Sequence, residues 1–123
     1  MTVHVGTDLI EIERVRRTLA RHERFRERCF TPAEQHYCDS RPNPAESYAG
    51  RFAGKEAVGK ALGLGVARAF AWRDIEIAGR PKPSVRLSGR VAAFAERHGF
   101  GRVDLSMTHS RELANAVAIV DER

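Results

Sequence analysis

Residues 46–62 constrain the fold of this chain most strongly, because they combine a helical pattern with many very small residues. Alanine recurs at every fourth position and would form one unbroken ridge on a helix: Ala49, Ala53, Ala57 and Ala61. Three glycines interrupt the same stretch, and each costs about 1 kcal/mol relative to alanine in a helix interior: Gly50, Gly54 and Gly59. Such a helix is expected to have a neighbouring backbone packed closely against it. Gly63, just past its end, predicts a left-handed C-cap.

Glu56 and Lys60 stand one turn apart on the same face of this predicted helix. A pair at this spacing is often an ordinary surface contact that contributes about 0.2–0.5 kcal/mol. The local pattern leaves that interpretation and a functional one equally open. Two further candidates are Asp8, which ends a predicted strand, and His109, at the tip of a predicted hairpin. Each of these, taken alone, is more often a turn or capping residue than part of a site.

The remaining pattern predicts short strands and helices. Alternating apolar residues predict strands at residues 3–8, 72–78 and 85–87, and a hairpin over residues 102–120. Helical spacing predicts helices after Asp8, at residues 33–39, and from Ser88 to about residue 98, with Ser88 as the cap of the last one. Thr31 and Glu34 form a capping-box signature before the second of these helices. The predicted fold class is α+β: a single domain, residues 1–123, with a small, mostly antiparallel sheet packed on a long central helix plus shorter helices.

The composition is that of an ordinary soluble globular protein, with 123 residues, 42% hydrophobic and 30% charged. No apolar run approaches the roughly 18 residues of a membrane span, and the first residues lack a signal-peptide pattern. We therefore expect a cytoplasmic protein without a membrane partner. Cys29 and Cys38 lack the spacing of a zinc site and are expected to be free thiols.

The formal net charge of +5 points to an acidic or polyanionic partner, without choosing among nucleic acid, a phosphate-rich ligand and an acidic protein. Five arginines follow one another at spacings of three and four residues, which places them on one side of a helix that is expected to break near His22. We call them the arginine stripe: Arg14, Arg17, Arg21, Arg24 and Arg28. Such a stripe is usually a solvated helix face, but it is also a suitable docking surface for an acidic partner.

Asp8, Glu56 and Lys60 together suggest phosphate chemistry. Two carboxylates and a lysine, without the Cys/His spacing of a zinc site, suit a hard cation such as Mg²⁺ that also binds the phosphates of a substrate. Such a cation neutralises the charge that develops as a phosphate ester bond breaks, and a lysine can assist the leaving oxygen.

Three segments resemble the signature blocks of the 4′-phosphopantetheinyl transferases, specifically the short holo-[acyl-carrier-protein] synthase type. They are residues 6–8 (Gly-Thr-Asp), residues 51–63 (Arg-Phe-Ala-Gly-Lys-Glu-Ala-Val-Gly-Lys-Ala-Leu-Gly) and residues 106–110 (Ser-Met-Thr-His-Ser). Residues 30–34 and 72–77 also stand where that family has similar segments. The order and separation of the blocks fit, so the resemblance covers essentially the whole chain. The central block is the most specific of the three.

This resemblance implies a transferase that moves the phosphopantetheine arm of coenzyme A to a serine of an acyl carrier protein and releases adenosine 3′,5′-bisphosphate. Asp8 and Glu56 would bind Mg²⁺. Glu56, or a metal-bound water that it orients, would accept the serine proton, and Lys60 would neutralise phosphate charge. The coenzyme A contacts would be Arg51, Lys60, Gly63 and His109. The arginine stripe would dock the carrier protein, and the enzyme would be a homotrimer of fatty acid or polyketide biosynthesis, with each active site shared between neighbouring subunits.

The chain departs from the family pattern at three positions. Ser110 stands where some members have an acid that helps to hold the metal, so no third metal ligand is assigned. Gly54 and Gly59 replace a more frequent alanine or serine, which puts a side-chain role at these positions in doubt. One alternative function is a small basic module that binds RNA or another polyanion. Another is a family member that kept the fold as a structural or regulatory subunit and lost activity. The RNA-binding module accounts for the charge but not for Asp8, Glu56 and Lys60, and aromatic residues are not interleaved with the arginines.

Overall fold

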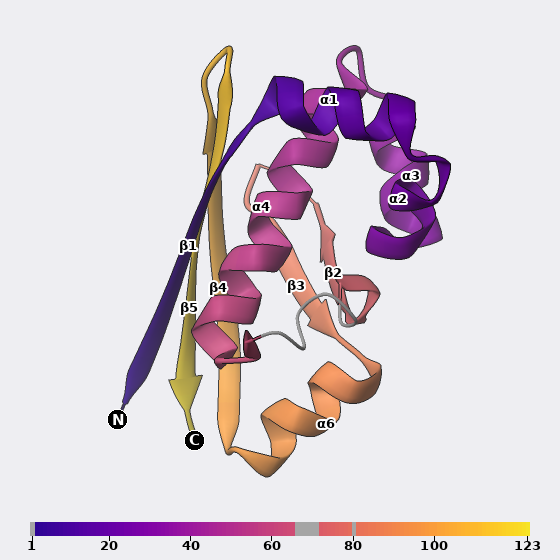
Figure 1. The fold of residues 1–123 in the computed structure, drawn as a ribbon. Coiled ribbons are helices and arrows are strands. Elements are labelled where there is room, and N and C mark those ends of the chain that lie inside the picture. The colour runs from indigo at the N-terminus through magenta and orange to yellow at the C-terminus, as the bar shows by residue number, and fades with distance from the viewer. Residues whose placement is uncertain (1, 66–71, 80) are drawn as a thin grey trace.

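The computed structural model describes residues 2–65, 72–79 and 81–123. The elements follow one another as β1 (Val3–Glu11), α1 (Ile12–Arg21), α2 (Glu23–Cys29), α3 (Pro32–Asp39), α4 (Pro44–Leu62), the 3₁₀ turn η2 (Trp72–Asp74), β2 (Ile75–Ala78), β3 (Ser84–Leu87), α6 (Gly89–Arg97), β4 (Phe100–His109) and β5 (Leu113–Glu122) (Figure 1). The predicted α+β class with one long central helix is therefore confirmed. Within the described ranges, every helix is too short or too polar to cross a membrane.

The strands form two antiparallel sheets, whereas a single sheet was predicted. The larger sheet has the order β1-β5-β4, so that β5 lies in the centre and pairs on both sides. Among the described residues, strands β2 and β3 pair only with each other, in a separate two-stranded sheet. The predicted hairpin of β4 and β5 is confirmed, and His109 is the last residue of β4, opposite Ala114.

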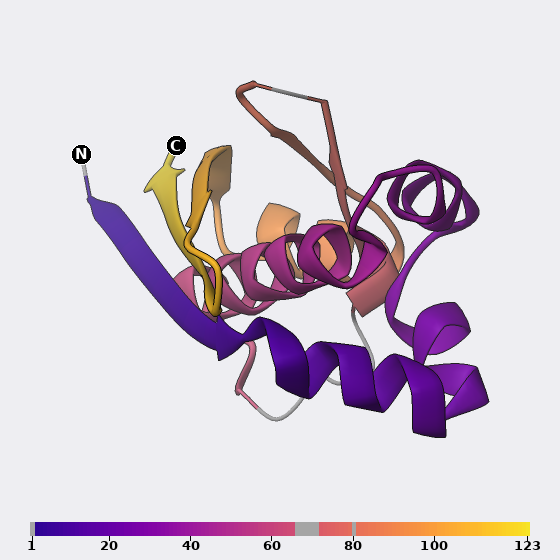
Figure 2. The same cartoon turned by 90° about the horizontal axis from the view of Figure 1, so that it is seen from above.

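Helix α4 lies between the two sheets and is covered by α1 as well (Figure 2). Its alanine ridge is almost completely buried, with exposures of 0–4%. Strand β1 passes directly over this ridge: a Cβ atom added to Gly6 would overlap the carbonyl oxygen of Ala57 and lie 2.6 Å from the nitrogen of Ala61. On another side, a Cβ atom on Gly54 would lie 2.6 Å from Cδ1 of Ile77 in β2. The predicted close approach of neighbouring backbone to this helix is confirmed.

Several predicted boundaries are correct because the signals that set them are local. Gly63 ends α4 in the left-handed region, at a φ of 72°. Thr31 and Glu34 form the capping box at the start of α3. His22 adopts an extended conformation and separates α1 from α2. Helix α4 begins two residues earlier than predicted, because the Asn43 side chain caps it and accepts a hydrogen bond from the nitrogen of Glu46.

Two boundary predictions and one capping prediction are wrong. Strand β1 does not end at Asp8 but continues to Glu11, because its last residues pair with β5. Residues 72–74 form a 3₁₀ turn instead of the start of a strand. Ser88 stands at the N-cap position of α6, but its side chain makes no capping hydrogen bond. The carboxylate of Asp74 caps this helix instead, since it accepts hydrogen bonds from the nitrogens of Arg90 and Val91 at 3.0 and 3.4 Å.

A buried ion pair joins α3, α4 and β2. The ammonium nitrogen of Lys55, with 0% exposure, lies 2.7 Å from the carboxylate of Glu34 and also donates to the carbonyl oxygens of Trp72 (2.8 Å) and Ile75 (2.6 Å). Glu34 in turn accepts hydrogen bonds from the backbone nitrogens of Thr31 and Ile77. Burial lowers the pKa of Lys55, and the charge of Glu34 opposes this shift.

Cys29 and Cys38 are both free and buried, as predicted for thiols without a metal site. Burial raises the pKa of each thiol to about 12. Both thiols are therefore protonated in the folded protein at neutral pH, and neither is a reactive nucleophile.

Candidate active site

Asp8 and Glu56, the two predicted metal ligands, line one cavity. This carboxylate cavity has a volume of about 400 Å³ and lies between β1, α1, α2 and α4. Asp8 reaches it from β1 and Glu56 from α4, although 48 positions separate them in the sequence. Its remaining lining is mostly apolar, with one arginine: Leu9, Ile10, Arg14, Val15, Thr18, Phe25 and Phe52.

Lys60 lies beside Asp8. Its Nζ atom donates to the carbonyl oxygen of Thr7 at 2.9 Å and to Oδ1 of Asp8 at 3.1 Å. Glu56, one turn earlier on α4, accepts a hydrogen bond from the indole nitrogen of Trp72 at 2.8 Å. The structure thus brings the three predicted catalytic residues, Asp8, Glu56 and Lys60, to one place.

The two carboxylates fit a cation that completes its coordination with substrate and water. Among residues 2–65, 72–79 and 81–123, no group of three or more His, Cys, Asp or Glu side chains could hold a metal ion by itself. This donor set differs from the all-protein cage of a structural zinc or calcium site. It agrees with Mg²⁺, which usually binds through one or two carboxylates together with waters and phosphates.

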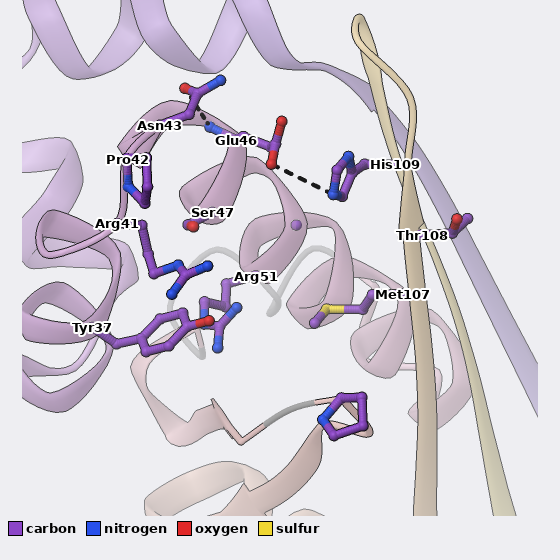
Figure 3. A pocket seen from close by; sticks show the side chains of 12 residues that line it. Tyr37, Arg41, Pro42, Asn43, Glu46, Ser47, Arg51, Met107, Thr108 and His109 are labelled. Atoms are coloured by element: carbon purple, nitrogen blue, oxygen red, sulfur yellow. Dashed lines mark hydrogen bonds and ion pairs between the residues drawn. The ribbon is translucent and has the colours of Figure 1, made fainter.

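A second cavity contains Arg51 and His109. This arginine cavity has a volume of about 340 Å³ and is lined by residues of α3, α4 and β4, of the loop before α4 and of the loop between β2 and β3 (Figure 3). The guanidinium of Arg51, a residue only 6% exposed, lies 4.1 Å from the centre of the Tyr37 ring, and Arg41 faces the same ring at 5.6 Å. His109 lies on the opposite wall, with its Nε2 atom 3.4 Å from Oε1 of Glu46.

The buried guanidinium of Arg51 can still donate a hydrogen bond. Within the part of the chain that the structure describes, its Nε atom is buried without a hydrogen-bond partner. Buried N–H groups are nearly always paired, and guanidinium groups bind phosphates through two parallel hydrogen bonds. The arginine cavity is therefore well suited to a phosphorylated ligand.

The structure does not bring all predicted site residues together. The carboxylate cavity and the arginine cavity have no lining residue in common, so Asp8 and Glu56 are separated from Arg51 and His109 within one subunit. Gly63 is exposed at the end of α4 and lines neither cavity.

The arginine stripe is exposed along its whole length and is divided between α1 and α2. Arg14 lines the carboxylate cavity. Three others line a third cavity of about 700 Å³, which we call the stripe cavity: Arg21, Arg24 and Arg28. The stripe cavity and the carboxylate cavity share Thr18 and Phe25, so the stripe leads directly to Asp8 and Glu56.

Among the cavity residues that sequence reasoning did not predict as site residues are Arg41 and Trp72. Arg41 stands in a short loop beside Pro42, and a single arginine in a loop carries no signal of its own. Trp72 could have been noticed as the only tryptophan of the chain, but its contact with Glu56 spans 16 positions and follows no periodic pattern.

Comparison with known proteins identifies the family. The family model of the 4′-phosphopantetheinyl transferase superfamily matches residues 4–118. A holo-[acyl-carrier-protein] synthase from Chlamydia felis is 48% identical over 118 residues, covering 94% of this chain and 94% of its own. The enzyme of that name from Moorella thermoacetica is 46% identical over 123 residues, covering 97% of this chain and 94% of its own.

Solved structures agree with this comparison. The crystal structure of the holo-[acyl-carrier-protein] synthase from Neisseria meningitidis superposes with a TM-score of 0.86 at 30% identity, covering 97% of this chain and 98% of its own. The Helicobacter pylori enzyme, solved in complex with coenzyme A, superposes with a TM-score of 0.81 at 30% identity, covering 95% of this chain and 99% of its own. The chain therefore belongs to the 4′-phosphopantetheinyl transferase superfamily and, within it, to the holo-[acyl-carrier-protein] synthases.

Proposed function

We propose that this protein transfers the 4′-phosphopantetheine group of coenzyme A to a serine of an apo acyl carrier protein. The products are the holo carrier protein and adenosine 3′,5′-bisphosphate, and the reaction serves fatty acid or polyketide biosynthesis in the cytoplasm. The observation that carries the proposal is the position of Asp8 and Glu56 in one cavity, with Lys60 bonded to Asp8. Relatives of nearly equal length are holo-[acyl-carrier-protein] synthases, which supports the same conclusion.

Mg²⁺ is the cofactor that the carboxylate cavity fits. Asp8 and Glu56 would hold the ion together with phosphate oxygens of coenzyme A. Bound there, it would neutralise negative charge on the pyrophosphate.

The side chains of this protein would carry the proton and the charge of the reaction. Glu56 would act as the general base and accept the proton of the serine hydroxyl. The serine oxygen would form a bond to the phosphorus that carries the pantetheine arm, while the bond from this phosphorus to the bridging oxygen breaks. The bonding electron pair leaves with adenosine 3′,5′-bisphosphate. Lys60, already held beside Asp8, would place its positive charge at the leaving phosphate.

The arginine cavity would bind the phosphates of the adenosine half of coenzyme A. Arg51 supplies a buried guanidinium with an unpaired Nε–H among the described residues, and Arg41 supplies a second cation. His109 faces them across the cavity (Figure 3). Gly63 remains a predicted coenzyme A contact through its exposed backbone at the end of α4.

A homotrimer would unite the two halves of the site. Because the two cavities are separate in one subunit, we propose that Asp8 and Glu56 of one subunit face Arg51 and His109 of its neighbour. The outer face of the larger sheet, opposite α4, supports this assembly because it exposes a row of large apolar side chains: Val3, Val5, Leu9, Leu113 and Ile119.

The central test is the conversion of an apo carrier protein in the presence of coenzyme A and Mg²⁺. We expect the carrier to gain one phosphopantetheine mass, and Glu56→Gln to slow this gain by about 10²-fold or more, the usual contribution of a general base. The proposal is refuted if wild-type protein produces no gain, or if Glu56→Gln matches the wild type.

Mixing two inactive variants tests the shared site. Glu56→Gln and Arg51→Met each damage a different half. In a mixed oligomer, an interface formed by Glu56 of one subunit and Arg51 of the other is intact, so activity should recover. If both halves belonged to one subunit, every site would carry a substitution and the mixture would stay inactive.

Charge reversal tests the arginine stripe as the docking surface for the carrier protein. Arg21→Glu with Arg24→Glu should raise the KM for carrier protein and leave the KM for coenzyme A unchanged, because both arginines lie outside the carboxylate cavity. Equal increases in both constants would contradict a docking role.

A further inference from the structure

Trp72 lies between the stripe cavity and Glu56. Its indole Nε1 atom donates to Oε1 of Glu56 at 2.8 Å. Its ring packs against Phe52, with the ring centres 5.2 Å apart, and also lines the stripe cavity. The side chain is therefore fixed by packing on one side and hydrogen bonded to the proposed general base on the other.

The backbone of Trp72 is fixed as well. The fully buried ammonium of Lys55 donates to the carbonyl oxygen of Trp72 at 2.8 Å. An ammonium group has three N–H donors, and the other two acceptors are Glu34 and the carbonyl oxygen of Ile75. Lys55 and Glu56 are consecutive residues of α4. One turn of this helix thus holds both the carbonyl group and the indole group of residue 72.

We propose that Trp72 is a positioning residue for Glu56, orienting the carboxylate through its indole N–H while Lys55 anchors its carbonyl group. A glutamate side chain has three rotatable torsions, and a general base must point at the proton that it accepts. A hydrogen bond from a rigid, packed ring selects one orientation before the substrate binds, which lowers the entropic cost of the reaction. This inference rests on the proposed function of Glu56.

Nuclear magnetic resonance tests the contact without any measurement of activity. Because the chain has one tryptophan, its ¹H–¹⁵N spectrum contains one indole signal, and it belongs to Trp72. We expect Glu56→Gln to move this signal upfield, since the charged acceptor is lost. Tyr48→Phe is the matched control: it removes a different aromatic donor, which bonds Asp39, and should leave the indole signal in place. An indole signal that is unchanged in Glu56→Gln overturns the proposal.

Kinetics test the positioning role. Biosynthetic incorporation of benzothienylalanine, which has sulfur in place of the indole N–H, changes only residue 72 and keeps the size of the ring. We expect kcat to fall about tenfold, the effect of losing one hydrogen bond to a charged group, with both KM values changed by less than about twofold. Trp72→Phe should also lower kcat, whereas Tyr48→Phe should keep the wild-type kcat.

The outcomes separate the two proposals. An unchanged kcat, or a rise in KM alone, shows that Trp72 only packs and overturns the positioning role. A wild-type protein that transfers nothing refutes the proposed function and the positioning role with it. The indole signal then still decides whether Trp72 holds Glu56.

Discussion

Replacement of Lys55 by methionine would leave the carboxylate of Glu34 without its cation inside the core. Lys55 is 0% exposed and Glu34 is 2% exposed, so water cannot take over the role of the ammonium. Methionine fills the space of the lysine stem, but the carbonyl oxygens of Trp72 and Ile75 also lose their donor. Removal of one partner from a buried pair costs about 3–5 kcal/mol, a large part of the roughly 5–15 kcal/mol that stabilises a typical domain.

Glu34→Gln would likewise leave the buried ammonium of Lys55 without its counter-charge. It should lower the free energy of unfolding by a similar amount. The double substitution removes both charges, so the second change relieves the damage of the first. We expect the double variant to lose about 3–5 kcal/mol, whereas the two single losses would sum to about 6–10 kcal/mol. The measurement is urea unfolding at one fixed protein concentration, because association of subunits makes the midpoint depend on concentration.

Glu96→Gln is the matched control for Glu34→Gln. Glu96 pairs with Arg123 at 3.0 Å, but its side chain is 76% exposed. Replacing this glutamate by glutamine should therefore lower the free energy of unfolding by less than about 1 kcal/mol. The reasoning is refuted if Lys55→Met lowers the free energy of unfolding no more than this surface substitution does. It is also refuted if the loss in the double variant equals the sum of the losses in Lys55→Met and Glu34→Gln to within about 0.5 kcal/mol.

Three further predictions concern stability. Gly6→Ala should cost about 3 kcal/mol or more in urea unfolding, because its methyl group would overlap the backbone of α4, whereas Gly50→Ala should be neutral or stabilising, since nothing lies within 4 Å of the added atom. The free energy of unfolding should fall between pH 9 and about pH 12, by about 1 kcal/mol in the first pH unit and up to about 1.4 kcal/mol per pH unit above it, for each of Cys29 and Cys38. Burial raises their pKa from 9.0 to about 12, so the unfolded thiols lose protons that the folded thiols keep. Asp74→Ala should cost about 1 kcal/mol through the lost cap of α6.

Each of these predictions has a result that contradicts it. Gly6→Ala with wild-type stability would mean that β1 does not touch α4. A free energy of unfolding that is constant between pH 9 and pH 10 would rule out buried, protonated thiols. For the cap of α6, Ser88→Ala serves as the control, since the Ser88 side chain makes no capping bond; a loss as large as that of Asp74→Ala would reverse the assignment.

The sequence predicted those features that depend on neighbouring residues. The Gly63 C-cap and the Thr31 capping box follow from groups within one helical turn, and the alanine ridge on α4 follows from helical periodicity. The burial of Lys55 was missed because its partner lies 21 positions away. The cap of α6 was assigned to Ser88, the adjacent polar residue, because chain folding alone brings Asp74 to that helix.

The candidate site was likewise predicted only in part from the sequence. Spacing alone left Glu56 and Lys60 indistinguishable from a surface pair. Their chemistry suggested a site shared with Asp8, and the family resemblance supported that grouping, but periodicity did not show that the three residues lie close together. The resemblance implied a site shared between subunits, but neither the resemblance nor the residue pattern specified that Arg51 and His109 would line one cavity and Asp8 and Glu56 another. Residues on different sides of α4 line different cavities together with residues of the strands beside them. A sequence pattern does not show which residues of distant elements face the same cavity.

The central place of β5 in the larger sheet has a consequence for synthesis on the ribosome. Residues 113–122 are translated after every other element described above, yet they supply the partner of both β1 and β4. Until they emerge, both strands have unpaired edges, which are prone to pairing with other chains. The sheet can therefore form only after translation of β5, and the nascent chain should depend on protection from aggregation until then.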